Sequence, residues 1–550
     1  MANLIGDVSG TVYEAFRHSV ARYPNQDFLC LLRQTAAQYG IEARTWSYAQ
    51  AAHEVESLLE RYRATGYGQG HRVGLMLENR PAFFFHWLAL NALGVSVVPI
   101  HTEWRSSELE YLVGHSEICL AVVPVARWPD LIRAARSSGQ TLAVTDTEFA
   151  DWGAASCPAP AGNAVPGVDT ECALLYTSGT SDRPKGCVLA NEYFLCAGRW
   201  YAELDGLCEV RPGMERLITP LPMSHMNAMA FSTMVMLLTG GCIVPLDRFH
   251  PDSWWECVRD SRATIIHYLG VMPSMLLGAP PCARDRDTGV RFGFGAGVSA
   301  RLHAAFENRF GFPLIEAWAM TETGAGAAII ANREPRKVGT TCFGRADSRI
   351  ECRVIDNDGR TVPCGEPGEL LVRHSGAVPG YGFFRYYLKD PQATKAAWAG
   401  GYFHTGDVVQ LDSDGDFHFI DRKKNVIRRS GENISALEVE GVLMQHPRIA
   451  AVGVTAVADE VRGDEVMACI VPRESLSAAE RTALARDILR FSLERLAYFK
   501  APGYIGFCER LPLTTTEKIK RVELRALGDS LLQDPACIDV RKLKRRTGVA

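Results

Sequence analysis

The chain has 550 residues, and its hydrophobic fraction of 47% and charged fraction of 22% are those of an ordinary globular protein. At about 150 residues per domain, this length predicts three or four folding units and excludes a single core. The formal net charge of −4 excludes a global basic field that would attract nucleic acid or an anionic membrane surface.

Cysteine usage and the N-terminus indicate the compartment. The 16 cysteines are scattered singly, without a Cys-x-x-Cys pair, which favours free thiols in a reducing cytoplasm. The first seven residues lack the basic and apolar regions of a signal peptide. Residues 218–246 contain no Asp, Glu, Lys or Arg, but prolines, glycines and polar residues interrupt them. We expect a loop, a buried helix at residues 228–238 and a buried strand at 242–245, and no membrane insertion.

The first 150 residues alternate helical and strand patterns. Strands separated by helices of this length predict a parallel α/β sheet with right-handed crossovers. The expected helices are residues 12–23, 46–62, 82–93 and 108–116, and the expected strands are 72–76, 96–100 and 119–123. Residues 151–168, which are rich in Ala, Pro and Gly, are expected to form a linker.

The α/β pattern resumes after residue 245 and later gives way to short strands. The expected helices are residues 253–262, a short helix from 272, and 299–310, and the expected strands are 264–269, 291–297 and 313–318. From about residue 339, turns rich in Asp, Asn and Gly separate short strands. This pattern predicts antiparallel β structure, as a small barrel-like subdomain or a distorted sheet.

A second boundary falls near residue 421. Beyond it, Ser435 and Ser477 each begin a Ser-x-x-Glu capping box ahead of a helix. Strands are expected at residues 451–457 and 466–471, between the two helices. The fold class is therefore α/β plus β plus α+β, with an N-terminal region at residues 1–421, a hinge at 422–424 and a small C-terminal domain at 425–550.

The segment from Tyr176 to Gly186 has a composition that suits a polyanionic ligand. It contains four Ser or Thr residues, two glycines and Lys185. Glycine permits close backbone approach, hydroxyls donate hydrogen bonds, and lysine supplies a compact positive charge. It is not a Walker A loop, because Pro184 and Gly186 flank the lysine where that motif needs Gly and Ser or Thr. The plain alternative is a Ser/Thr/Gly-rich surface loop.

Two further motifs carry glycines and polar residues. Gly295-Ala296-Gly297 permits close backbone approach, and residues 316–322 end the next strand with Thr321 and Glu322. Residues 402–407 end in Asp407, whose carboxylate can accept hydrogen bonds from two ribose hydroxyls. Taken alone, Trp318 is more often a core aromatic than a base-stacking platform, and Asp407 could equally cap a turn.

The chain resembles the adenylate-forming enzymes, which include acyl- and aryl-CoA synthetases, peptide-synthetase adenylation domains and luciferases. The resemblance spans the whole chain and rests on ordered motifs at residues 176–186, 316–322, 402–407, 421–433 and 511–521. It implies a large N-terminal region of two α/β subdomains and a β subdomain, followed by a small mobile C-terminal domain.

The resemblance also implies roles for the residues that match these motifs. The phosphates of ATP would be bound by Thr177, Ser178, Gly179, Thr180, Ser181 and Lys185, and the adenosine by Gly295, Ala296, Gly297, Glu316, Ala317, Trp318, Asp407 and Arg422. The catalytic residues would be Lys518, Thr321, His225 and Glu322, the last as the Mg²⁺ ligand. Lys424 would be the hinge, Gly431, Glu432 and Asn433 would line the thiol entry path, and Asn227, Gly270 and Met320 would line the acyl pocket.

For function, the resemblance implies an AMP-forming acyl-CoA ligase that uses ATP, Mg²⁺, CoA and a small-molecule carboxylic acid. Residues 253–259 and 270–273 are most similar to the crotonobetaine/carnitine-CoA ligase branch, but this likeness does not transfer the substrate. Homodimers are common among similar enzymes. The carboxylic acid itself stays undecided.

Three positions depart from the family pattern. Trp318 replaces Tyr, Ala319 replaces Gly, and Glu517 replaces the Gly before Lys518. Three alternatives also stay open: loading of a carrier protein in trans, an acyl-AMP that is itself the product or is oxidised, and a non-catalytic nucleotide-binding regulator. Retained ATP binding without pyrophosphate release on any acid would favour the regulator.

Overall fold

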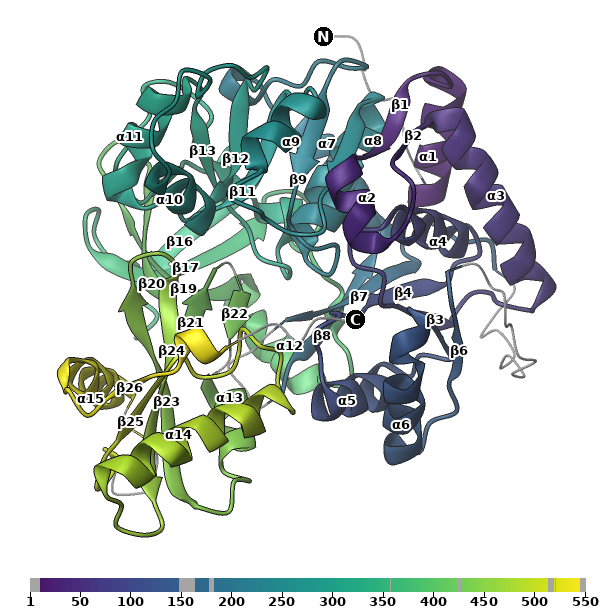
Figure 1. Ribbon diagram of the computed structural model, residues 1–550. Coiled ribbons are helices and arrows are strands. Elements are labelled where there is room, and N and C mark those ends of the chain that lie inside the picture. The colour runs from purple at the N-terminus through teal and green to yellow at the C-terminus, as the bar shows by residue number, and fades with distance from the viewer. Residues whose placement is uncertain are drawn as a thin grey trace.

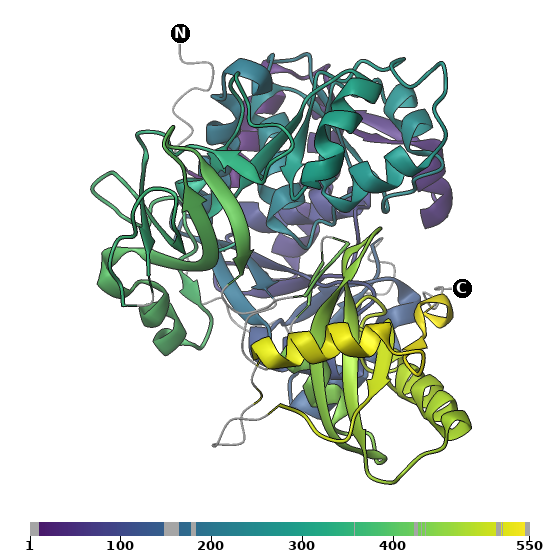
Figure 2. The ribbon, with the colours of Figure 1, turned by 90° about the vertical axis from the view of Figure 1, so that its left-hand side faces the viewer.

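The computed structural model describes residues 10–147, 164–177, 183–356, 358–422, 427–430, 432–434, 436–512, 519 and 521–544. Two α/β sheets and a smaller antiparallel sheet form a large N-terminal part, and a C-terminal domain lies against it (Figure 1). Seen from the side, the antiparallel sheet flanks the two α/β sheets, and the C-terminal domain lies below (Figure 2).

One α/β sheet has seven strands, in the spatial order β18 (Tyr386–Tyr387), β8 (Lys185–Ala190), β7 (Glu171–Thr177), β4 (Ser96–Pro99), β3 (Arg72–Leu75), β5 (Leu120–Val122) and β6 (Ala143–Thr145). The strands from β7 to β6 are parallel, whereas β7 and β8 form an antiparallel hairpin that β18 extends. The apolar sides of α5 (Ser106–Ser116) and α6 (Trp128–Ser138) cover one face of this sheet.

The other α/β sheet has eight strands, in the order β14 (Ile329–Ile330), β13 (Leu314–Trp318), β12 (Phe292–Ala296), β11 (Ile265–Leu269), β9 (Arg216–Thr219), β10 (Cys242–Pro245), β1 (Asp27–Leu31) and β2 (Arg44–Ser47). The six inner strands are parallel, and β2 and β14 pair antiparallel at the edges. Its outer face is covered by α9 (Trp254–Asp260), α10 (Val271–Gly278) and α11 (Ala300–Phe310).

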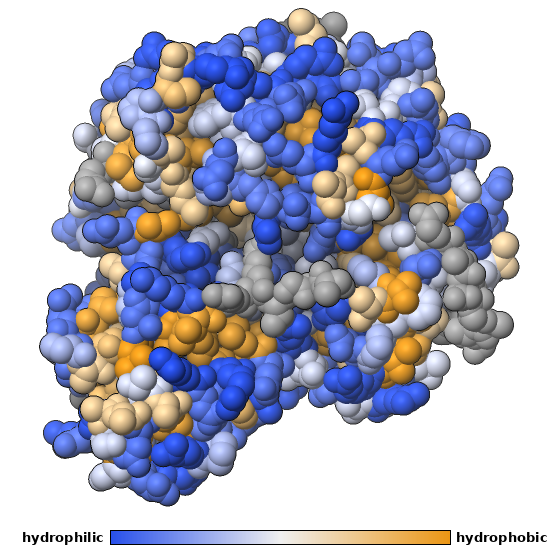
Figure 3. Space-filling view, in the orientation of Figure 1, coloured by the Kyte–Doolittle hydropathy of each residue, from blue (hydrophilic) through white to orange (hydrophobic). Residues whose placement is uncertain are grey.

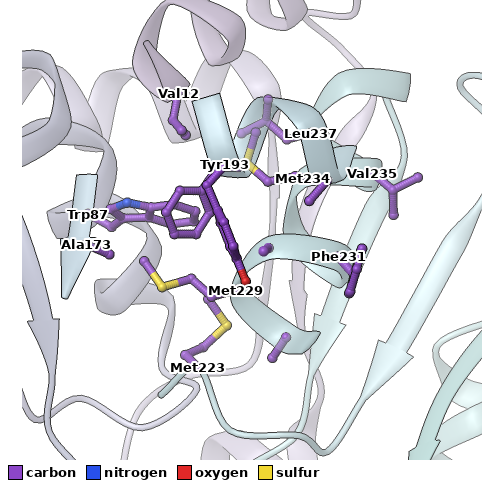
Figure 4. Close-up of a cluster of buried hydrophobic side chains, with 14 of the residues drawn as sticks. Val12, Trp87, Ala173, Tyr193, Met223, Met229, Phe231, Met234, Val235 and Leu237 are labelled. Carbon is purple, nitrogen blue, oxygen red and sulfur yellow. The ribbon is translucent and has the colours of Figure 1, made fainter. Parts of the chain in front are cut away.

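The main core lies between the two α/β sheets. Its helices are α1 (Val12–Arg22), α3 (Tyr48–Ala64), α4 (Pro81–Ala92), α7 (Asn191–Ala202), α8 (Thr233–Thr239) and a π-helix at Asn227–Ser232. Trp87, Tyr193 and Met229 meet there from α4, α7 and the π-helix (Figure 4). A helix packed on all sides must be apolar all round, which explains the run of aromatic and aliphatic residues in α4.

The sequence predicts most of these helices and strands with small shifts at their ends, but it misassigns the first 150 residues in one respect. They contribute to both sheets, because β1 and β2 join the eight-stranded sheet while β3 to β6 build the other. Trp46, expected to open a helix, lies in β2 opposite Leu29. The helix α2 (Arg33–Tyr39) between β1 and β2 was not expected either. Pairing with distant strands decides these assignments, and local pattern does not contain it.

The third sheet is antiparallel, with the order β15 (Cys342–Gly344), β20 (Phe417–Arg422), β19 (Phe403–Leu411), β17 (Pro367–His374) and β16 (Ile350–Ile355). Helix α12 (Pro391–Ala397) precedes β19. Because β15 and β16 stand at opposite ends of this order, the described residues form an open sheet. The expected β structure is present, but its barrel-like closure is not confirmed.

The C-terminal domain is α+β, as expected. Its sheet contains β22 (Glu432–Ile434), β21 (Ile427–Arg429), β24 (Gly463–Pro472), β25 (Tyr504–Phe507) and β26 (Ile538–Asp539), and β23 (Ile449–Asp459) pairs with β24. The helices are α13 (Ala436–Leu443), α14 (Ala478–Leu493) and α15 (Arg521–Gln533). The capping box between Ser477 and Glu480 is formed at the start of α14. Ser435, the start of the other predicted box, lies outside the described residues.

A buried lysine joins the C-terminal domain to the large part. The Lys500 ammonium donates hydrogen bonds of 2.8 Å to Glu108 of α5 and of 2.8 Å to Glu438 of α13. The neighbouring Phe499 ring packs against His101 at 5.4 Å between centroids. Since Glu108 belongs to the large part, this contact holds the domain in the observed orientation.

The uncharged segment at residues 218–246 lies in the core. It forms β9, the π-helix, α8 and β10. The π-helix and α8 correspond to the expected buried helix, and β10 corresponds to the expected buried strand. Within the described ranges, no helix combines the length and the apolar character that crossing a membrane requires.

Candidate active site

A cavity of about 2340 Å³ opens where the two α/β sheets, the antiparallel sheet and the C-terminal domain meet. Small-molecule pockets usually measure about 300–1,000 Å³, so this one has room for more than one ligand. Hydrophilic side chains border much of the gap between the upper part of the molecule and the C-terminal domain at lower left (Figure 3). The sequence-predicted residues can now be located against this cavity.

The phosphate-loop motif connects the two strands of an antiparallel hairpin. Thr177 ends β7 and lies opposite Lys185, which begins β8. Both side chains line the cavity, and the Lys185 ammonium lies 4.6 Å from the centre of the Tyr387 ring. Ser178, Gly179, Thr180 and Ser181 lie outside the described residues. This hairpin differs from a Walker A loop, which passes from a strand into a helix.

Glu322 and Lys185 both contact the side chain of Tyr387. The Tyr387 hydroxyl donates a hydrogen bond of 2.9 Å to Glu322 Oε1. The carboxylate lines the cavity with Thr321 and is only 7% exposed. A single carboxylate beside the predicted phosphate-binding segment fits Mg²⁺, which usually takes one or two protein ligands and completes its shell with phosphates and water.

A second cluster of carboxylates, in the antiparallel sheet, is paired with a lysine. Asp412, Asp414 and Asp416 converge on the Lys337 ammonium at 2.5, 2.7 and 3.1 Å. His418 also contacts Asp412 at 2.7 Å. These contacts hold the pKa of Asp412 below its ordinary value, although burial by itself would raise it. The cluster is therefore a structural ion-pair network of the antiparallel sheet.

The glycine turn after β12 is built so that only glycine fits. A Cβ on Gly295 would lie 2.2 Å from the Tyr268 carbonyl oxygen, and Gly297 has φ +80°. Glu316 braces the turn by accepting hydrogen bonds from Gly297 N at 2.8 Å and Val298 N at 3.1 Å. The Tyr268 hydroxyl donates a third, at 2.7 Å. Ala296 and Ala317 line the cavity beside this turn.

Trp318 contacts the predicted ribose-binding carboxylate directly. Its indole N–H donates a hydrogen bond of 2.9 Å to Asp407 Oδ2, and its ring stacks near Phe343. Asp407 is 1% exposed and lies opposite Arg422 in the pairing of β19 with β20. Of Arg422 the structure describes only the backbone. The sequence offered Trp318 as a core aromatic or a stacking platform, and the hydrogen bond to Asp407 was missed.

The predicted acyl-pocket residues line one end of the cavity. His225, Asn227, Gly270 and Met320 all belong to its wall. Gly270 is packed so tightly that a Cβ there would lie 1.7 Å from the Gly297 carbonyl oxygen. Sequence reasoning missed the aromatic residues that complete this end, which are Trp200, Phe231 and Phe294. They come from α7, the π-helix and β12, and only the fold shows that these elements meet at the cavity.

Glu432 belongs to the C-terminal domain, and its side chain lines the cavity. Its carboxylate lies 3.4 Å from His225 Nε2 and 3.8 Å from His101 Nε2. Burial would raise the pKa of Glu432, but the two histidines outweigh it and hold this pKa well below its ordinary range. Burial would likewise lower the pKa of His101, but the Glu432 carboxylate outweighs it and raises this pKa. Glu432 and His101 therefore form an ionic contact across the domain boundary, and His225 lies beside it.

Several predicted residues cannot be positioned. Lys518, Lys424 and Gly431 lie outside the described residues, and for Asn433 only the backbone is described. Their roles stay predictions, as do the domain limits at 421 and 425.

Comparisons with known proteins agree with this organisation. The family described as AMP-binding enzyme matches residues 16–382, and AMP-binding enzyme C-terminal domain matches residues 438–518. A crotonobetaine/carnitine–CoA ligase of Shigella flexneri is 31% identical over 494 residues, covering 87% of this chain and 93% of that protein.

Solved structures show the same fold. An o-succinylbenzoate CoA synthetase from Bacillus subtilis, as a double mutant bound to a product analogue, superposes with a TM-score of 0.77 at 22% identity, covering 93% of this chain and 98% of that one. The amide bond synthetase from Marinactinospora thermotolerans also gives 0.77, at 21% identity, with coverages of 94% and 99%. The Bacillus enzyme in complex with its acyl-adenylate intermediate gives only 0.62, at 22% identity and coverages of 94% and 98%.

Proposed function

This chain belongs to the AMP-binding enzyme family, and from that premise we propose that it is an AMP-forming acyl-CoA ligase. The substrate carboxylate attacks the α-phosphorus of ATP, the bond to the β-phosphate breaks, and pyrophosphate leaves as acyl-AMP forms. The CoA thiol then loses its proton, its sulfur attacks the acyl carbonyl, and AMP leaves as the thioester forms. Dividing one hard step into two easier ones is the logic of covalent activation.

The observation that carries this proposal is the convergence on one cavity of three groups that are predicted to bind the nucleotide. Lys185 lies beside the phosphate-loop motif, Glu322 beside that lysine, and Asp407 at the predicted ribose position. Displacement at phosphorus depends mainly on charge neutralisation and in-line positioning, which these groups can supply. A bound Mg²⁺ would neutralise phosphate charge, and Glu322 is the residue that would hold it.

We further propose that the observed domain orientation serves the thioester-forming step. Glu432 of the predicted thiol path faces the cavity beside His225. The better superposition on the Bacillus enzyme with its product analogue than on the same enzyme with its acyl-adenylate supports this assignment. For the first step, the C-terminal domain would rotate about Lys424 and bring Lys518 to the α-phosphate and the substrate carboxylate.

This two-orientation proposal predicts different effects on the two half-reactions. Lys518→Ala should lower acyl-AMP formation by about 100-fold or more, since it removes a charge that neutralises the transition state. The same variant should keep thioester formation from supplied acyl-AMP. Separate assays of the two half-reactions measure this split. Loss of both steps in a folded variant would contradict the proposal.

The test of the ligase itself is pyrophosphate release from MgATP across a panel of carboxylic acids, each with and without CoA. Turnover that needs CoA and yields an acyl-CoA supports the ligase. Release that is indifferent to CoA would instead indicate a carrier protein or a free adenylate as the end point. ATP binding without release on any acid would favour the non-catalytic regulator.

We also propose a cytoplasmic location and a homodimer. The first is supported by the cysteines of the described part, which are all free thiols and mostly buried. The second is an analogy with similar enzymes, and light scattering on the purified protein tests it.

A further inference from the structure

A buried histidine lies behind the acyl end of the cavity, at the centre of a short hydrogen-bond chain. His267 of β11 is 0% exposed, and its Nε2 lies 3.0 Å from the Tyr201 hydroxyl. On the other side, its Nδ1 lies 2.7 Å from Asn227 Oδ1 and 2.8 Å from Ser232 Oγ. The chain thus runs from Tyr201 through His267 to Asn227, which lines the cavity.

The direction of this chain follows from the chemistry of its members. Burial lowers the pKa of His267 to about 3, so the ring is neutral and carries one proton. A phenol is a stronger donor than acceptor, so Tyr201 donates to Nε2 and the ring proton sits on Nδ1. Nδ1–H then donates to Asn227 Oδ1. This bond fixes which end of the Asn227 amide faces the ring.

The Nδ2 end of the Asn227 amide is available to bind a ligand. Among the described residues, none provides a hydrogen-bond acceptor for Asn227 Nδ2, whereas Oδ1 is held by His267. Asn227 begins the π-helix, a widened turn that occurs frequently at functional sites. The Ser232 hydroxyl closes the turn by donating to the Asn227 carbonyl oxygen at 3.2 Å. Asn227 is therefore held at its side-chain oxygen by His267 and at its backbone carbonyl oxygen by Ser232.

The surrounding wall named above is aromatic and carries no charge. The rings of Trp200, Phe231 and Phe294 are in contact, with centroids 5.3 to 6.3 Å apart. The other members of the hydrogen-bond chain are the Tyr201 phenol and the Ser232 hydroxyl, and neither carries a charge.

We propose that Asn227 is a specificity-determining donor that selects a carboxylic acid whose acyl group carries a neutral hydrogen-bond acceptor, such as a ketone, ether or amide oxygen. The proposal rests on the proposed ligase function and names the substrate class of the same site. An acid without this acceptor leaves the Asn227 amide unpaired, and a quaternary ammonium brings positive charge against its N–H₂ group. Such acids are disfavoured, although the curated relative is named for two trimethylammonium acids.

The experiment compares pairs of acids that differ only in the acceptor. Keto acids of increasing chain length are each paired with the methylidene acid of the same shape, and trimethylammonium butanoate is the charged member. We expect the wild-type enzyme to favour the keto acid of at least one pair about tenfold in kcat/KM, the size of one hydrogen bond to a buried group. Equal use of both members of every activated pair would overturn the proposal.

Substitutions assign the preference to Asn227. Asn227→Leu should use the two members of the preferred pair equally. Asn227→Asp, which has the same shape but a negative charge and no N–H₂ group, should gain activity on trimethylammonium butanoate relative to the keto acid. Asn308→Asp, at an exposed position of α11, is the matched control and should keep the wild-type ratios. A preference for the keto acid that survives in Asn227→Leu would overturn the assignment.

His267 acts through Asn227 and is a positioning residue. His267→Phe keeps the ring volume but releases the amide, so the keto preference should fall while activity on the methylidene acid persists. A loss of activity on both acids to the same extent would show a structural role only.

A binding assay separates this proposal from the ligase function. Acylsulfamoyl adenosines are stable mimics of acyl-AMP, and the keto and methylidene forms can be compared by calorimetry without turnover. Absence of pyrophosphate release on every acid would overturn the ligase, and the calorimetric ratio then still decides the role of Asn227. A ratio near one would reject it.

Discussion

Trp318 and Asp407 lie 89 residues apart in the chain and meet through one hydrogen bond of 2.9 Å. The indole occupies a position where similar enzymes usually have tyrosine, and it joins the segment predicted for adenine to the carboxylate predicted for ribose. A buried carboxylate that is held by a donor keeps its orientation before the nucleotide arrives. We therefore propose that Trp318 affects ATP binding through Asp407.

Trp318→Phe keeps an aromatic ring and removes the N–H donor. We expect the KM for ATP to rise about tenfold, since loss of a hydrogen bond to a buried charged group costs about 1.5–3 kcal/mol and part of it is recovered by relaxation. Initial rates of pyrophosphate release at varied ATP measure it. Trp255→Phe, at the outer helical layer of the eight-stranded sheet, is the control. An unchanged KM in Trp318→Phe would show that the bond does not position Asp407.

At the scale of secondary-structure elements, the approach of β12 to the start of α10 shapes the nucleotide end of the cavity. Gly270 precedes α10 and faces the Gly297 carbonyl at a distance that leaves no space for a side chain. Glu316 of β13 then holds the turn from the other side. Two strand-to-helix connections, from β11 to α10 and from β12 to α11, thus shape the turn together with β13.

Gly270→Ala should push this turn out of position, because its Cβ would lie 1.7 Å from a backbone oxygen. We expect ATP binding to weaken at least tenfold and the free energy of unfolding to fall by about 1–3 kcal/mol, as for overpacking of a tight core. Gly278→Ala, at the other end of the same helix, meets no atom within 4 Å and is the matched control. Nucleotide titration and thermal unfolding of both variants measure the difference, and equal behaviour would contradict it.

At the scale of the whole molecule, the orientation of the C-terminal domain depends on charges buried between the domains. Lys500 is 4% exposed and is shared by Glu108 and Glu438, which lie on opposite sides of the boundary. Removing one partner of a buried ion pair leaves uncompensated charge and is far more costly than losing a surface pair. The second contact is the ionic contact of Glu432 with His101, beside His225.

Lys500→Met should destabilise the observed orientation by about 3 kcal/mol, because it leaves two carboxylates buried without their cation. If this orientation serves thioester formation, that half-reaction should slow more than acyl-AMP formation. The matched control is Lys389→Met, which breaks an exposed pair with Glu117 and should cost less than about 1 kcal/mol. Half-reaction rates and thermal unfolding measure both variants. A thioester half-reaction as fast as that of the wild type would contradict the role of Lys500.

The contact between Glu432 and His101 predicts a pH dependence with a defined sign. Because the pKa of His101 is raised in this orientation, its contribution is complete below the ordinary histidine pKa of about 6.5 and is lost as pH rises through the raised value. The lowered pKa of Glu432 makes its contribution complete above about pH 4.3, and it is lost as pH falls through the lowered value. The domain contact should therefore weaken as pH rises from about 6.5.

Energy transfer between dyes placed on the two domains, followed from pH 5 to pH 9, measures this change. His101→Gln should remove most of the alkaline part of the curve. Glu103 and Lys500 also lie near His101 and are unchanged in this variant. The difference between the variant and wild-type curves therefore reports on His101. A flat curve in the wild-type protein would reject the pH dependence.

The family resemblance, the order of α/β, β and α+β parts, and most helices and strands could be predicted from the amino-acid sequence. Periodicity of apolar residues and turn residues are local, and the motifs at residues 176–186 and 402–407 are continuous in the chain, so both can be recognised without a fold. The same holds for Glu322 and Gly297, whose residue types carry their chemistry.

The three-dimensional fold was needed to show which strands share a sheet, that the antiparallel sheet is open over the described residues, and which residues from distant parts of the chain meet. Trp318 with Asp407, His267 with Asn227, and Lys500 with Glu108 are pairs of residues from separate elements. Their partners are selected by strand pairing and helix packing, which sum many weak contacts over the whole molecule. Because no local pattern contains that sum, a lysine and a histidine that looked ordinary in the sequence, and a tryptophan whose partner was not predicted, acquire these contacts only in the fold.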